Sequence, residues 1–203
     1  MARDSGAADE PTAAPAPATV DELAFREAIG HFATGVTVIT TLHDGKPAGM
    51  TASAVASLSL DPVLLLVCIA NRLPTHTAIE RAQRFVVNVL GEGQEKLALH
   101  FARPSADKFA DVELVLDREL PVLADAIAYF VCDVHESFPG GDHSIFTGLV
   151  RECGATSGKQ PLLYFRSGFG VLRDPNAEIL QQTLGWDMPS LSGVAPVHGA
   201  ARP

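Results

Sequence analysis

The feature that most constrains the fold is a run of alternating β-branched residues, 36–42, followed by the pair Asp44-Gly45. Valine, isoleucine and threonine favour extended strands, and Asp-Gly is typical of the tight turn that joins two strands of a hairpin. Short strand-like segments bounded by Gly, Pro, Asn or Asp recur along the chain, and few segments have helical periodicity. The pattern predicts a mainly β fold with a few helices, a barrel or sandwich rather than a Rossmann fold.

The period of the apolar residues and the turn signals predict the element boundaries. Thr19 and Glu22 have the spacing of a capping box, and Pro74 suits the first position of a helix. The continuous apolar segment 63–69 predicts a strand that is buried on both faces. Helices are expected at 21–33, 74–82 and 94–101. Strands are expected at 36–42, 48–58, 63–69, 85–90, 126–136, 144–152, 162–165 and 169–172, with one short strand within 112–123.

Length and composition predict the domain limits. The 203 residues fit one domain with flexible ends. Residues 1–18 are mostly Ala, Pro, Asp and Glu, which bury too little apolar surface to offset their ordering entropy, so we expect a disordered tail. After residue 172 the strand pattern is lost, and an irregular C-terminal tail is expected over 173–203. The folded domain is therefore expected at 19–172.

Charge and cysteine content argue against several classes of function. A formal net charge of −9 disfavours nucleic acid, which needs clustered Lys and Arg, and no apolar run reaches the ~18 residues of a membrane span. Cys68, Cys132 and Cys153 are widely spaced and lack zinc-ligand spacing. They predict buried or half-buried thiols in a reducing compartment, the cytoplasm, and no metal site.

A nucleotide ligand would have to be held without the usual glycine-rich loops. The sequence has no G-x-G-x-x-G after a strand and no G-x-x-x-x-G-K-[ST]. Segment 49–59 is the main alternative, because Thr51, Ser53, Ser57 and Ser59 are expected on one strand face by the period of two. Small side chains let a flat ring approach the backbone, and hydroxyls can bond ring carbonyls or a ribityl chain. A solvated strand face would have the same pattern.

A second candidate lies where the helix at 74–82 is expected to start. Asn71, Arg72 and Thr75 surround this point. A helix N-terminus offers free N–H groups and the positive end of the helix dipole, which suit a phosphate. Ordinary capping beside a surface arginine explains the same residues.

A third candidate is the glycine-rich connection Gly140-Gly141-Asp142-His143. Glycines allow a ligand to come close, and a histidine supplies a proton site near neutral pH. A plain hairpin loop is the alternative. Phe101 and Lys108 are a weaker signal: an aromatic ring can close a pocket and a lysine can meet a phosphate, but each also fits an ordinary core or surface position.

Taken together in this order, the segments resemble the short-chain flavin reductases of two-component monooxygenases. The resemblance extends from about Leu23 to Leu172. The matching motifs are Phe25-Arg26, Phe32-Ala33-Thr34-Gly35-Val36-Thr37-Val38-Ile39-Thr40-Thr41, Gly49-Met50-Thr51-Ala52-Ser53, Ser57-Leu58-Ser59-Leu60-Asp61-Pro62, Thr75-His76, Phe85-Val86-Val87-Asn88-Val89-Leu90, Lys108-Phe109, Gly141-Asp142-His143 and Pro161-Leu162-Leu163-Tyr164-Phe165-Arg166.

The resemblance implies an FMN-binding split β-barrel, usually a homodimer. It implies flavin contacts from Thr51, Ala52, Ser53, Ala54, Val55, Ser57 and Leu58, and phosphate contacts from the segment that contains Asn71, Arg72, Thr75 and His76. Phe101 and Lys108 would close that pocket. The nicotinamide nucleotide would face Asp142, His143 and the residues Phe165, Arg166, Ser167 and Gly168.

The implied activity is reduction of FAD or FMN by hydride from NADH, with reduced flavin passed to a partner monooxygenase. The two cofactors carry this chemistry, so the protein stacks the rings and no side chain acts as a nucleophile. We expect His143 to orient the nicotinamide or supply a proton. NADH is favoured over NADPH because no arginine cluster marks a 2′-phosphate site. Two alternatives stay open: a non-catalytic flavin-binding or flavin-sensing protein, and another enzyme on a related barrel, such as a vitamin-phosphate oxidase or a haem-handling protein.

Overall fold

The computed structural model describes residues 20–105, 107–115 and 119–172. The two tails expected at 1–18 and 173–203 lie outside the described residues. The described part falls in one compact unit that ends at Val171, with Leu172 beyond it. In chain order its elements are α1 (Glu22–Ile29), β1 (Thr34–Gly35), β2 (Thr37–His43), β3 (Lys46–Ala52), β4 (Val55–Leu60), β5 (Val63–Ala70), α2 (Pro74–Ala82), β6 (Arg84–Val89), α3 (Glu95–Ala102), β7 (Ala128–Gly140), β8 (His143–Ala155), β9 (Leu162–Phe165) and β10 (Gly168–Val171).

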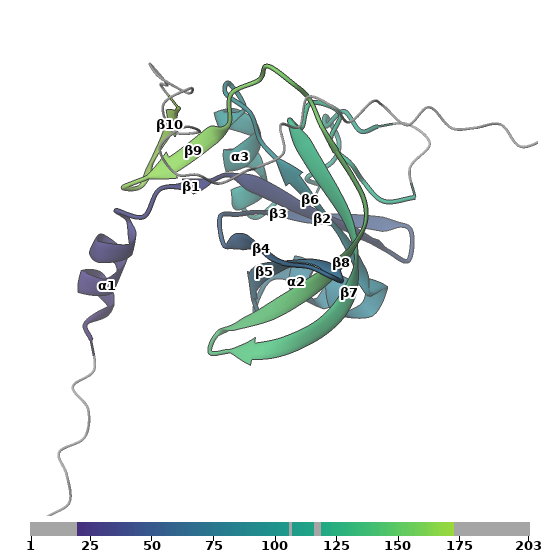
Figure 1. Cartoon of the computed structure of the whole chain (residues 1–203), viewed down its shortest axis with the longest axis horizontal. Coiled ribbons are helices and arrows are strands. Elements are labelled where there is room, and N and C mark those ends of the chain that lie inside the picture. The colour runs from purple at the N-terminus through teal and green to yellow at the C-terminus, as the bar shows by residue number, and fades with distance from the viewer. Residues whose placement is uncertain (1–19, 106, 116–118, 173–203) are drawn as a thin grey trace, which may run out of the picture. The chain divides into compact units, whose positions relative to one another are not determined.

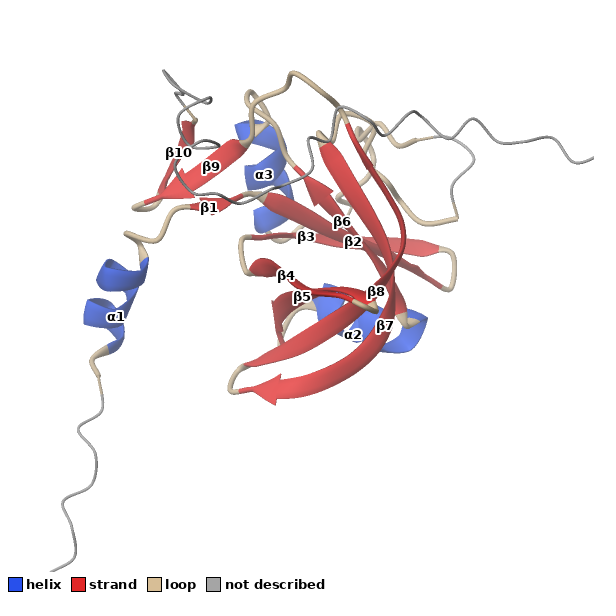
Figure 2. Ribbon diagram, viewed as in Figure 1, coloured by secondary structure: helices blue, strands red, loops and turns tan. Residues whose placement is uncertain are grey.

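Seven antiparallel strands form a rolled sheet in the order β3-β2-β6-β7-β8-β5-β4 (Figure 2). Strands β3 and β4 are the two edges of this sheet, yet only Ser53 and Ala54 separate them in the sequence. An extended residue spans at most about 3.6 Å, so two residues cannot bridge a flat seven-stranded sheet. The sheet therefore curls so that its two edges lie at the same corner, and the seam between β3 and β4 is left open, without strand pairing. The prediction of a mainly β, split-barrel fold is confirmed.

The long hairpin of β7 and β8 forms one wall of the barrel (Figure 1). Its register shifts twice, between Val131 and Cys132 and between Val134 and Glu136. Such bulges bend a strand and increase its twist. The bends let β8 pair with β5 near the hairpin tip, where His143 lies opposite Ala70.

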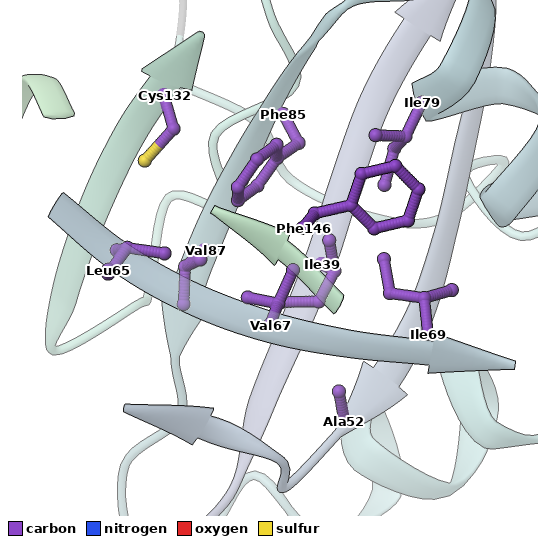
Figure 3. Close-up of a cluster of buried hydrophobic side chains, with 10 residues drawn as sticks. All are labelled: Ile39, Ala52, Leu65, Val67, Ile69, Ile79, Phe85, Val87, Cys132 and Phe146. Carbon is purple, nitrogen blue, oxygen red and sulfur yellow. The ribbon is translucent and has the colours of Figure 1, made fainter. Parts of the chain in front are cut away.

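The barrel interior is filled by alternate residues of the strands. Phe85 and Val87 of β6 point inward, whereas Val86 between them packs in a separate cluster with Val131. Ile79 of α2 closes the interior from one end. Figure 3 shows the inner side chains directed toward one another: Ile39, Ala52, Leu65, Val67, Ile69, Ile79, Phe85, Val87, Cys132 and Phe146.

A second, three-stranded sheet has the order β1-β9-β10. The turn between β9 and β10 has Arg166 at φ 47° and Ser167 at φ 63°, the left-handed pair that a tight hairpin requires. The N–H of Arg166 donates to the carbonyl of Gly30 at 2.8 Å, which joins this hairpin to the end of α1. No residue of α1 itself is buried.

Four expectations need correction. The strand expected at 48–58 is two strands, because the chain crosses the seam at Ser53 and Ala54. Strand β5 alternates between buried and half-buried residues rather than being buried on both faces. The first helix covers only Glu22–Ile29, and its N-cap is Asp21, whose carboxylate accepts from the Ala24 N–H at 3.1 Å. Cys153 is exposed rather than buried or half-buried.

Candidate functional site

The seam between β3 and β4 brings the small residues of the flavin-like segment to the surface. Ser53, Ala54, Ser57 and Leu58 are exposed, and Thr51 and Val55 are half-buried. Because β3 and β4 are both edge strands, each has unpaired backbone N–H and C=O groups along its outer side. The seam therefore combines free backbone polar groups with side chains too small to obstruct a flat ring.

The four hydroxyl residues expected on one strand face do not share it. The corner at 53–54 separates Thr51 from Ser57, and a bulge follows, since Ser57 lies opposite Leu65 but Ser59 lies opposite Leu64. Leu58 is the extra residue of this bulge. A period of two holds only within an uninterrupted strand.

Two of the candidate residues lie behind β3, on the side of α3. Phe101 is completely buried, and its ring makes an edge contact with Phe109 at 5.2 Å. The Lys108 ammonium donates to the carbonyls of Gly49 at 3.1 Å and Phe101 at 2.8 Å. Burial lowers the pKa of Lys108. Both side chains thus support β3 from inside, and the Thr51 hydroxyl adds a bond to the Ala98 carbonyl at 2.6 Å.

The start of α2 has the features expected of a phosphate site. Leu73 is the N-cap and has no side-chain hydrogen bond to offer, and Pro74 stands at the first helical position. Thr75 and His76 are only 4% and 6% exposed, whereas Arg72 is exposed. Within the described part of the chain, no residue bonds the Thr75 hydroxyl. Pro74 has no N–H and the His76 N–H donates to the Leu73 carbonyl at 3.0 Å, which leaves the Thr75 N–H at the helix start. A helix start with this N–H, an arginine and a free hydroxyl is suited to an anion.

The Gly-Asp-His turn closes the β7–β8 hairpin. Gly141 has φ 72°, a left-handed conformation that suits glycine. His143 Nδ1 is 2.7 Å from Asp142 Oδ1. The hydrogen bond with His143 is the largest cause that lowers the pKa of Asp142, and electrostatic interactions with His143 and Arg72 lower it further. The carboxylate therefore orients the imidazole and leaves Nε2 directed away from it.

The structure brings the 71–76 segment and the Gly-Asp-His turn together. The Asn71 N–H donates to the Asp142 carbonyl at 3.0 Å. Ser144, directly after His143, bonds the side chains of Asn71 and His76. Sequence reasoning missed Ser144, because nothing in a strand pattern tells which earlier loop its hydroxyl meets. It included Gly49 in segment 49–59 but did not predict that the Phe101 ring packs against this glycine.

The residues 165–168 lie elsewhere. They form the β9–β10 hairpin of the second sheet, where the rings of Phe165 and His31 are 6.1 Å apart. In the described residues no hydrogen bond, ion pair or ring contact joins this hairpin to His143, and Figure 1 draws the two hairpins well apart. One chain thus does not bring together the two segments expected to face nicotinamide.

Two further surveys cover only the described ranges. No helix in them is long and apolar enough to cross a membrane. They contain no group of three or more His, Cys, Asp or Glu side chains placed to hold a metal ion.

Comparison with known proteins places this arrangement in a family. A family model described as flavin reductase like domain matches residues 29–173. The reductase component of 4-nitrophenol 4-monooxygenase/4-nitrocatechol 2-monooxygenase from Rhodococcus opacus is 48% identical over 151 residues, which cover 74% of this chain and 81% of that protein.

Solved structures agree with the family model. The flavin reductase PheA2 superposes with a TM-score of 0.70 at 38% identity, over 76% of this chain and 100% of that one. The NADH:FAD oxidoreductase SgcE6 from Streptomyces globisporus, solved with NAD and FAD fragments, superposes with a TM-score of 0.73 at 38% identity, over 78% and 96% of the two chains. The chain therefore belongs to the family of proteins with a flavin reductase like domain.

Proposed function

We propose that the protein is an NAD(P)H:flavin oxidoreductase that reduces FAD or FMN and supplies the reduced flavin to a partner monooxygenase. The observation that carries this proposal is the unpaired β3–β4 seam, with exposed Ser53 and Ala54, in a barrel that α2 closes at one end. Relatives named as reductase components of monooxygenases and as NADH:FAD oxidoreductases support it. None of the relatives named above is described as a flavin sensor.

The residues at the seam fit a flavin. The isoalloxazine ring has polar edges and a flat apolar body, and the seam offers edge-strand backbone groups beside Ala54, Val55 and the exposed Leu58. When flavin and NADH are both bound, hydride passes from nicotinamide C4 to flavin N5. The seam segment Thr51–Leu58 fixes the position of the isoalloxazine ring. The flavin phosphate is held by Asn71, Arg72, Thr75 and His76.

Phe101 and Lys108 act indirectly in this proposal. Phe101 packs under Gly49, and Lys108 bonds the Gly49 carbonyl, so both keep β3 in the position that a ring needs. To contact a phosphate directly, the Lys108 ammonium would have to break its hydrogen bonds to the carbonyls of Gly49 and Phe101.

His143 is the residue that we assign to the nicotinamide. Its Nδ1 is held by Asp142, so Nε2 is the atom available to orient a carboxamide or hold a proton. Nearby, Asn71 and Arg72 belong to the proposed phosphate segment, which puts the two nucleotides side by side. NADH is the favoured donor, and its cytoplasmic supply agrees with the free thiols Cys68 and Cys153.

We also propose that the protein works as a homodimer. Helix α1 buries nothing in its own chain, although Leu23, Phe25, Ile29 and Phe32 on and just beyond it are more than half exposed. Contiguous exposed apolar surface of this kind marks a protein interface. A second copy would also supply Phe165–Gly168 to the site, since one chain keeps this hairpin away from His143.

The deciding test measures NADH oxidation by the purified protein, with FAD, with FMN and without flavin, and repeats each with NADPH. We expect oxidation that requires added flavin and saturates with it, because flavin is then a substrate that leaves in reduced form. An anaerobic assay, in which flavin absorbance is lost as NADH is consumed, checks that the electrons of NADH pass to flavin. Tight flavin binding without oxidation of either nucleotide would contradict the reductase and favour a flavin-binding protein.

A further inference from the structure

A polar network joins β8 to the loop that precedes α2. The Ser144 hydroxyl donates to Asn71 Oδ1 at 3.0 Å, and Ser144 Oγ lies 2.8 Å from His76 Nε2. The Asn71 N–H donates to the Asp142 carbonyl at 3.0 Å. Three hydrogen bonds thus connect the segment assigned to the flavin phosphate with the turn assigned to the nicotinamide.

The chemistry of a hydroxyl fixes the direction of these bonds. Serine has one hydroxyl proton, which is given to Asn71, so its oxygen accepts from the N–H on His76 Nε2. One small side chain therefore satisfies an acceptor and a donor at once. Alanine can do neither, whereas threonine carries the same hydroxyl on a residue that is well suited to a strand.

The two ends of this network differ in rigidity. Ser144 is the second residue of β8, near the hairpin tip, and has a paired strand on each side, with Ile69 of β5 and Pro139 of β7 opposite it. Asn71 belongs to the loop between β5 and α2 and is exposed. Because the strand residue is held on both sides, Ser144 is the anchor and the 71–76 segment is what it positions.

His76 is held on two further sides. Its ring makes an edge contact with Phe146 at 5.3 Å, and Nδ1 lies 3.4 Å from Glu80 Oε2. Since His76 is 6% exposed, no bulk water replaces the Ser144 oxygen as the acceptor of its Nε2–H. Loss of that acceptor would shift the ring at the third position of α2, beside the N–H groups that a phosphate uses.

We propose that Ser144 is a positioning residue for flavin: it holds Asn71 and His76, and through them the first turn of α2, in the geometry that receives the flavin phosphate. The inference rests on the proposed reductase function and deepens it. It assigns a flavin-affinity role to a residue on the nicotinamide side of the site, which touches neither flavin nor NADH itself.

The test compares Ser144→Ala, Ser144→Thr and wild-type protein in flavin titrations and in steady-state assays. We expect Ser144→Ala to raise the Kd and KM for FMN about tenfold, as the loss of one or two ordinary hydrogen bonds predicts, with little change in kcat at saturating flavin. Ser144→Thr should keep the wild-type values. The matched control is Ser137→Ala, at an exposed serine of the same hairpin whose hydroxyl makes no hydrogen bond within the described residues.

The readouts separate this inference from the reductase proposal. Direct flavin titration, followed by fluorescence quenching, needs no turnover. If wild-type protein binds FMN but oxidises no NADH, the reductase proposal fails, and a weaker titration by Ser144→Ala still supports the positioning role. Equal flavin affinity of wild type and Ser144→Ala in an active enzyme overturns the positioning role alone. An equal loss in Ser144→Thr overturns it too, because the hydroxyl would then not be what matters.

Discussion

At the scale of single residues, the site depends on one close approach. Gly49 lies on β3, and a Cβ built on it would stand 2.8 Å from Phe101 Cε1 and 3.1 Å from Phe109 Cζ. Those two rings pack in the cluster beneath the strand. The glycine therefore lets aromatic rings support the strand that leads into the flavin seam.

We expect Gly49→Ala to lower the free energy of unfolding by about 1–3 kcal/mol, the usual effect of overpacking in a filled core. Urea denaturation of the purified variant measures it. Gly170→Ala is the control, because a Cβ there meets nothing within 4 Å, and we expect a change within about 0.5 kcal/mol. Equal stability of the two variants would show that the rings move aside freely.

At the scale of elements, α2 serves both the core and the ligand. Ile79 fills the end of the barrel, and the first turn carries Thr75 and His76 into a nearly buried position. The N-cap, Leu73, supplies no side-chain oxygen. The helix start is thus anchored by packing, and the Thr75 N–H is left for an anion, because Pro74 has no N–H and the His76 N–H donates to the Leu73 carbonyl.

In the proposed site, Arg72 contributes to flavin affinity. We expect Arg72→Ala to raise the KM for FMN roughly tenfold or more, because a charge-assisted hydrogen bond is lost, while kcat at saturating FMN stays the same. Riboflavin has no phosphate, so its KM should not change. Arg81→Ala, at the other end of the same helix, is the control. If FMN and riboflavin are affected alike, Arg72 does not contact the phosphate.

At the scale of the whole molecule, the described residues include apolar side chains that no other described part of the chain covers. Leu23, Phe25 and Phe32 are 74%, 58% and 70% exposed, around a helix without a buried residue. A helix of eight residues is too short to be stable alone in water. We propose that a second copy of the chain covers this helix.

We expect light scattering to give twice the chain mass for the wild type and the single chain mass for the double variant Phe25→Ser, Phe32→Ser. Two phenylalanines removed from an interface lose several kcal/mol of association free energy. Leu99→Ser, an exposed leucine on α3, should stay dimeric. If the double variant keeps the wild-type mass, α1 is not part of the interface.

Local patterns were enough for much of the fold. The β-branched run and Asp44-Gly45 predicted β2 and its hairpin, and Pro74 predicted the first residue of α2, because these signals act through the backbone of a few neighbouring residues. The order of the motifs, read as a resemblance, predicted the split barrel and the family. The strand, turn and helix positions follow from the sequence alone, since steric and turn preferences are local.

Only the tertiary structure decided how distant segments meet. It divided the strand expected at 48–58 across a seam, because the sheet curls and the chain passes there from one edge strand to the other. In the tertiary structure Phe101 and Lys108 lie beneath β3, and Ser144 bonds Asn71, although 73 positions separate the two residues in the sequence. It also kept Phe165–Gly168 away from His143. Such contacts depend on how the sheet curls and packs, and local preferences along the chain do not encode this curvature.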